Sequence, residues 1–99
     1  MKAVIGNTVL AEAPTNQLVR IEGNWYFPPS SLTGKFEKSP TAYHSPWKGD
    51  AQYWNVGTDE GWLEDGAWSY PDPIPSAFEK VDADFSNYVA FDRRITVME

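Results

Sequence analysis

Three stretches of the chain mix large aromatic side chains with polar groups beside proline or glycine. They are residues 22–28, 45–53 and 67–73. Each stretch lies where a predicted strand meets a loop, and functional side chains concentrate at such places. Glu22 could act as a general acid or base if rings remove it from water, and Lys48 could pair with an anionic ligand group or stack on a ring. The ordinary alternatives are that Glu22 is a solvated carboxylate or a partner for Lys48, and that Lys48 is an ordinary surface lysine.

These stretches predict one concave aromatic pocket with a few convergent polar groups, which is the usual form of a small-molecule site. The predicted ligand-binding residues are Glu22, Asn24, Tyr26, Trp47, Lys48, Tyr53, Trp68 and Tyr70. Any catalysis there would use Glu22 or Tyr70 as acid or base, with Lys48 as an electrostatic stabiliser. Two alternatives stay open: each ring is a core residue whose polar atom is satisfied, and Asn24 is a turn residue.

The charge of the chain excludes two classes of partner. Eight basic and fourteen acidic residues give a net charge of −6. That balance argues against nucleic acid, which requires clustered Lys and Arg to replace counterions, and equally against an anionic membrane surface. The partner expected from the aromatic pocket is a small molecule, and the oligomeric state, monomer or homodimer, stays open.

The chain has no cysteine and a single histidine, His44. Disulfides, a cysteine-ligated zinc and a thiol nucleophile are thereby excluded, and no metal or other cofactor is predicted. A dyad of His44 and Ser45 is disfavoured because neighbouring residues of a strand point to opposite faces. The lack of disulfides favours a reducing compartment, and no apolar stretch resembles a signal peptide or membrane span, so a cytoplasmic location is expected.

Short strands must position these residues. Alternation and turn signals predict strands at residues 3–5, 8–10, 18–22, 41–44, 50–56 and 67–70, an acidic loop over 57–65, and a closing hairpin of residues 88–91 and 95–98. One helix is predicted to start near Ser76, which matches a capping box with Glu79, and to place Phe78, Val81 and Phe85 on one face. The prediction is a single domain over residues 1–99, mainly β, with two antiparallel sheets or a partly open barrel and one short helix.

Four motifs in order resemble the family described as domain of unknown function 427, which also carries a nucleotidyltransferase-like label. The motifs occupy residues 22–28, 46–53, 67–73 and 89–91, and residues 1–12 fit as well, so the resemblance covers nearly the whole chain. It implies a β-tent fold, in which two antiparallel sheets meet at an angle, and it implies no established activity. Ser45 departs from the family, which often has cysteine at this position, and so puts in doubt any thiol chemistry here.

Two other functions stay open. A nucleotidyltransferase would need paired carboxylates that hold Mg²⁺ and a glycine-rich phosphate loop. No such loop occurs, and Asp82 and Asp84 would diverge on the predicted helix. A protein- or glycan-interaction module would instead use exposed tryptophans, and it predicts that Trp25, Trp54 or Trp62 lies in a flat solvent-facing patch.

Overall fold

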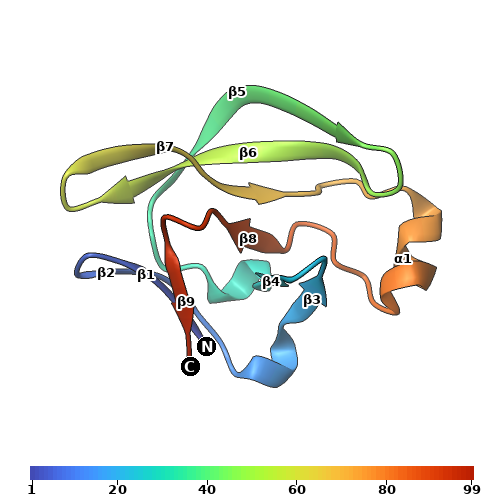
Figure 1. The fold of residues 1–99 in the computed structure, drawn as a ribbon, viewed down its shortest axis with the longest axis horizontal. Helices are drawn as coiled ribbons and strands as arrows, with labels where there is room; N and C mark the ends of the chain where they lie inside the picture. Colours follow the sequence, from blue (N-terminus) through green and yellow to red (C-terminus); the bar gives the residue numbers. More distant parts are fainter.

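Strands form most of the ordered structure in the computed structural model, which describes residues 1–99. They lie in three antiparallel sheets (Figure 1). The four-stranded sheet contains β5 (Phe36–Ser45), β6 (Gly49–Thr58), β7 (Gly61–Ser69) and β8 (Val89–Phe91). The three-stranded sheet contains β2 (Thr8–Glu12), β1 (Lys2–Ile5) and β9 (Thr96–Met98), and the third sheet contains β3 (Val19–Ile21) and β4 (Asn24–Tyr26). The helices are α1 (Pro75–Val81) and two 3-10 turns, η1 (Thr15–Gln17) and η2 (Pro29–Ser31).

The predicted class, mainly β with one short helix, is confirmed, and no sheet closes into a barrel. The strands form three sheets where two were predicted, because β3 and β4 pair only with each other. Their hairpin is nevertheless attached to the large sheet. Phe27 and Val89 exchange two backbone hydrogen bonds of 2.8 and 2.9 Å, which join the end of β4 to β8.

The four-stranded sheet packs an apolar cluster on each face, because successive residues of a strand point to opposite sides. Ala67 pairs with Phe91, and both belong to the first cluster. The next pair along these strands is Trp68 and Ala90. Ala90 is buried in the second cluster, and Trp68 packs against it. The buried members of the second cluster are Ile21, Tyr26, Tyr70, Ala77, Phe85 and Ala90. The residues of the candidate functional site, described below, pack on this second cluster. They therefore lie on the face of the sheet that points away from the first cluster.

The predicted closing hairpin is wrong. β8 pairs with β7 in the large sheet, whereas β9 pairs with β1 in the three-stranded sheet. Between them the chain turns at Asp92, whose backbone N–H donates to Gly66 and whose carbonyl accepts from Ile95. Burial of Ile95, which is 3% exposed, holds this crossing in place, so residues 92–95 connect two sheets instead of closing one.

The predicted acidic loop over residues 57–65 is also wrong. β6 continues to Thr58 and β7 begins at Gly61, so only Asp59 and Glu60 lie outside the strands. Thr58 stabilises this tight connection, since its hydroxyl donates to the carbonyl of Gly61 and accepts from the backbone N–H of Glu60. The acidic residues after Gly61 thus belong to a strand.

Strand β5 is longer than the predicted strand at 41–44 and runs through Pro40. An edge strand tolerates proline because one row of its N–H groups has no ladder partner. β5 is such an edge, and its pairing with β6 is irregular between Lys38 and Ala42.

Helix α1 is shorter than predicted and has a different start. Pro75 occupies its first turn, the cap residue is Ile74, and no side chain caps the helix, so the predicted capping box of Ser76 and Glu79 is absent. The helix ends at Val81 because Asp82 adopts a left-handed conformation with φ of 60°. Phe85 therefore lies beyond the helix, although it is fully buried. No helix in the structure has the length and apolar character that a membrane crossing requires.

Candidate functional site

The structure brings together the three aromatic stretches identified in the sequence. Lys48 lies in the turn between β5 and β6, and its backbone is held from two sides. Its N–H donates to the hydroxyl of Ser45 at 3.2 Å, and its carbonyl accepts from the N–H of Ile74 at 2.9 Å. Figure 1 shows α1 beside this turn. The fixed backbone directs the lysine side chain inward, so that only 9% of it is exposed.

The ammonium of Lys48 forms an ion pair with the carboxylate of Glu22. Glu22 lies in the turn of the β3–β4 hairpin, and 55% of its side chain is exposed. Glu22 and Gly23 have φ of 52° and 83°, as a two-residue type I′ turn requires. Asn, Asp or Gly usually occupies the first of these positions. A glutamate there is unusual, so turn formation alone does not explain why this residue occupies the position.

Aromatic rings surround the ammonium of Lys48. Its Nζ lies 5.3 Å from the ring centroid of Trp47 and 5.0 Å from that of Tyr70, both within cation–π range. Trp47 also lies 5.5 Å from the ammonium of Lys80 on α1. We refer to Glu22, Tyr26, Trp47, Lys48 and Tyr70 as the Lys48 cluster.

Tyr26 connects this cluster to Trp68 on β7. The indole N–H of Trp68 donates to the hydroxyl of Tyr26 at 2.9 Å, and the two rings meet edge to face at 6.4 Å. Tyr53 packs on the same indole at a ring distance of 6.2 Å. Tyr53, Trp68 and Tyr70 thus lie on one face of the large sheet, as strand alternation requires.

The environment keeps Lys48, Tyr26 and Tyr70 protonated at neutral pH. Burial alone would lower the pKa of Lys48, but the hydrogen bond to Glu22 and nearby negative charge more than offset it, so the pKa is raised. For Tyr26 and Tyr70, in contrast, burial raises the pKa, because it disfavours the charged phenolate. The charge of Lys48 opposes the increase in both. Besides the carboxylate of Glu22, the cluster therefore offers one fixed cation and two phenol hydroxyls, which suit the binding of an anion in place of that carboxylate.

Asn24 lines an open depression of about 390 Å³ together with Trp68, and no residue of the Lys48 cluster lines this depression. The other principal lining residues, which the sequence prediction missed, are Trp25, Phe91, Asp92 and Arg93. We refer to these six residues as the tryptophan groove. None of the main surface depressions is lined by Lys48, because rings occupy the space around it.

The sequence pattern of aromatic rings beside turn residues contains only part of the tryptophan groove. Trp25 lies within the first aromatic stretch, next to Asn24, so the pattern of rings beside turn residues already contained it. Asp92 and Arg93 carried no such signal, because they were predicted to form a hairpin turn. Their place in the groove follows from the crossing between the two sheets, which a local pattern does not reveal.

The three tryptophans of the interaction-module hypothesis do not share a patch. Trp62 is 55% exposed. Trp54 is half-buried and donates its indole N–H to Ser69 at 3.0 Å, and Trp25 is half-buried with the guanidinium of Arg20 at 4.7 Å over its ring. Of the three, Trp62 alone is exposed as that hypothesis predicts, and each lines a different depression.

His44 and Ser45 act separately. The Nδ1 atom of His44 lies 2.7 Å from a carboxylate oxygen of Asp50 at the surface, whereas Ser45 is 3% exposed and its hydroxyl accepts the N–H of Lys48. Ser45 thus shapes the turn that holds Lys48. The structure contains no group of three or more His, Cys, Asp or Glu placed to hold a metal ion.

We expect the protein to lose stability as the pH rises above about 10. Raised tyrosine pKa values mean that the unfolded chain releases these protons first, so unfolding becomes more favourable with pH. The stabilising charge of Lys48, whose pKa is also raised, is complete below about pH 10.4 and is lost at higher pH. Urea denaturation should show a loss of about 1–2 kcal/mol between pH 9 and 11. Tyr26→Phe and Tyr70→Phe should each reduce the loss, and an unchanged midpoint over this range would contradict the assignment.

A comparison with protein families identifies one whose model matches residues 1–98, described as a domain of unknown function (DUF427). This match confirms the resemblance seen in the four ordered motifs. No curated protein matches the chain. The match covers both the Lys48 cluster and the tryptophan groove, and its description assigns no activity.

Proposed function

The chain belongs to the family of domains of unknown function 427 (DUF427), and from its own site we propose that it binds a small organic anion at the Lys48 cluster. One observation carries the proposal. A nearly buried ammonium has a half-exposed carboxylate as its ion-pair partner, and that carboxylate stands on a hairpin turn. A ligand carboxylate or phosphate can replace such a partner without leaving the cation unpaired.

The asymmetry of exposure makes the exchange favourable. An ammonium removed from water requires a paired charge, because an unpaired buried charge is strongly destabilising. Lys48 is the buried member of the pair, and Glu22 is the exposed one. A ligand anion that takes the place of Glu22 preserves the neutralisation of Lys48, while the released carboxylate regains full hydration. Glu22 thus serves as an internal competitor for the ligand.

The backbone of Glu22 supports a role for its side chain. A non-glycine residue in the left-handed region is disfavoured by about 1–2 kcal/mol, and Glu22 has φ of 52°. Asparagine or glycine would fit this turn better. The glutamate is therefore explained by its carboxylate, which pairs with Lys48, and not by the turn.

The surrounding rings define what else the ligand must contain. Trp47 and Tyr70 place π-faces near the ammonium, and protonated phenols donate hydrogen bonds to an anion. Because the pKa of Lys48 is raised, its amine does not act as a nucleophile or base at neutral pH. Its contribution to any reaction at this site is electrostatic.

Isothermal titration calorimetry with acetate, benzoate and phenyl phosphate tests the proposal. Glu22→Gln removes the competing charge and keeps an oxygen that accepts from Lys48, so the anion that binds best should bind about tenfold more tightly. Lys48→Met should lose at least tenfold in affinity, since a hydrogen bond to a charged group contributes about 1.5–3 kcal/mol.

Lys80→Met is the matched control, because Lys80 also lies over Trp47 but carries no contact with Glu22. Its affinity should equal that of the wild type. Circular dichroism confirms beforehand that each variant is folded at the temperature of the titration. Equal affinities of wild type and Lys48→Met for every anion would refute the proposal.

A further inference from the structure

We propose that the tryptophan groove is a second ligand site, which binds a flat aromatic carboxylate between Trp25 and Trp68. The groove has a volume of about 390 Å³, enough for a molecule of one or two fused rings. It lies where β4 and β7 meet the crossing between β8 and β9. No residue of the Lys48 cluster lines it, so the ligand contacts of this site differ from those of the anion site proposed above, although Tyr26 of that cluster holds Trp68 in place.

The walls of the groove are held in place before any ligand binds. The indole of Trp68 is anchored by its hydrogen bond to Tyr26 and by ring contacts with Tyr26 and Tyr53. Trp25 is held by Arg20, whose guanidinium lies 4.7 Å from the ring centroid. Phe91, with 6% exposure, closes the apolar side. Rigid aromatic walls bind a flat ring with little loss of side-chain freedom.

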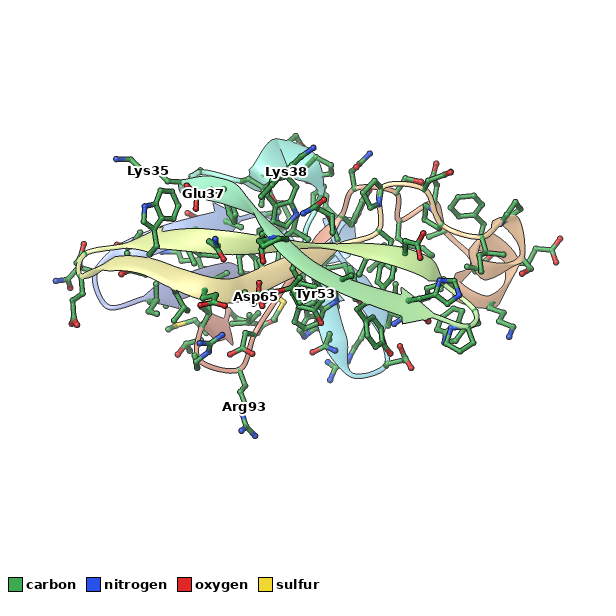
Figure 2. The ribbon with its side chains drawn as sticks, turned by 90° about the horizontal axis from the view of Figure 1, so that it is seen from above. Lys35, Glu37, Lys38, Tyr53, Asp65 and Arg93 are labelled. Carbon is green, nitrogen blue, oxygen red and sulfur yellow. The ribbon has the colours of Figure 1, made fainter.

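The polar groups of the groove select a negative charge. The carboxylate of Asp92 is already neutralised, because one of its oxygens accepts from the backbone N–H of Arg94 at 2.9 Å and from its Nε at 2.6 Å. Arg93 has no carboxylate within ion-pair distance and donates no side-chain hydrogen bond to the protein. Figure 2 shows its side chain extending away from the ribbon. Against the effect of burial, the charge of Arg93 contributes, after that of Arg94, to lowering the pKa of Asp92. The rim therefore carries one guanidinium without an ion-pair partner on a chain of net charge −6.

Asn24 adds a neutral donor and acceptor. It is half-buried beside Trp25, and its side-chain amide makes no hydrogen bond within the protein. A guanidinium binds a carboxylate through two parallel hydrogen bonds, and an amide can bind a second polar group of the same ligand. A flat ring that carries a carboxylate thus matches both the walls and the rim.

The test uses 2-naphthoate as the probe and follows the indole N–H signals in proton–nitrogen NMR spectra, assigned with Trp25→Phe, Trp62→Phe and Trp68→Phe. Addition of 2-naphthoate should shift the signals of Trp25 and Trp68 and leave that of Trp62 unchanged. Two reference compounds separate the requirements: naphthalene-2-carboxamide has the ring without the charge, and cyclohexanecarboxylate has the charge without the flat ring. Each should bind at least fivefold more weakly.

Arg93→Ala should weaken 2-naphthoate binding five- to tenfold and leave binding of the carboxamide unchanged. Lys35→Ala is the matched control, since it removes the same charge from a different side of the molecule, as Figure 2 shows. Lys48→Met should leave the Trp25 shift intact, even if the anion site at Lys48 proves wrong. The proposal is overturned by equal effects of Arg93→Ala and Lys35→Ala, by binding of the carboxamide as tight as that of naphthoate, or by absence of any Trp25 and Trp68 shift at 5 mM naphthoate.

Discussion

Replacement of Phe85 by alanine is expected to lower the free energy of unfolding by about 3–5 kcal/mol, the range found for buried phenylalanines. Phe85 is fully buried, and its ring meets those of Tyr26, Tyr70 and Phe78 edge to face at 6.3, 6.2 and 6.0 Å. Its removal leaves a cavity between the two tyrosines of the Lys48 cluster. The midpoint of thermal unfolding should fall by roughly 15–25 °C, as measured by circular dichroism.

Phe78→Ala is the control for this prediction. Phe78 is only half-buried and, among aromatic rings, contacts Phe85 alone, so its loss should lower the free energy of unfolding by no more than about 2 kcal/mol. Phe85→Leu retains most of the volume and should fall between the two. If Phe85→Ala were no less stable than Phe78→Ala, the ring cluster would not be what supports the site.

Part of the Lys48 cluster could be predicted from local sequence signals. Gly23 and Pro46 mark chain reversals, and Glu22 and Lys48 stand beside them, so both charges were expected at the ends of strands. Their ion pair was one of the three interpretations of Glu22. The unequal exposure of the pair could not be predicted, because it depends on Tyr70 and Ile74, which reach Lys48 from distant parts of the chain.

The division of the predicted pocket between the Lys48 cluster and the tryptophan groove could not be predicted from the sequence for a related reason. Strand alternation places Trp68 and Tyr70 on one face of the sheet, but it does not tell whether space remains between the rings. Phe85, expected on a helix, instead packs between Tyr26 and Tyr70 beyond the end of α1. The space near Lys48 is thus occupied, and the open depression is lined by other residues, Trp68 among them.

Strand partners were the least predictable part of the fold. Residues 88–91 and 95–98 are neighbours in sequence and suggested a hairpin, yet each pairs with a strand far away in the chain. Local pattern identifies a strand but not its partner, which is chosen by burial of one face. Here Ile95 enters the first apolar cluster, and this burial draws the end of the chain to β1.

The two members of the ion pair are expected to differ sharply in their effect on stability. Glu22→Ala should lower the free energy of unfolding by about 2 kcal/mol at pH 7, because it leaves the nearly buried ammonium of Lys48 without a counter-charge. The value lies below the range for fully buried pairs because Glu22 itself is half-exposed. Lys48→Met should change stability by less than about 1 kcal/mol, since methionine fills the apolar site and Glu22 becomes hydrated.

Glu22→Asn separates the ion pair from the turn. Asparagine suits the first position of a type I′ turn better than glutamate does, so this variant improves the turn while it removes the carboxylate from the reach of Lys48. If the lone ammonium causes the loss, Glu22→Asn should be destabilised nearly as much as Glu22→Ala in urea denaturation. Benzoate should then stabilise both variants more than the wild type, since an anion supplies the missing charge and no longer competes with Glu22. A greater loss in Lys48→Met than in Glu22→Ala would show instead that the lysine is held for packing, and the basis for an exchangeable anion site would be gone.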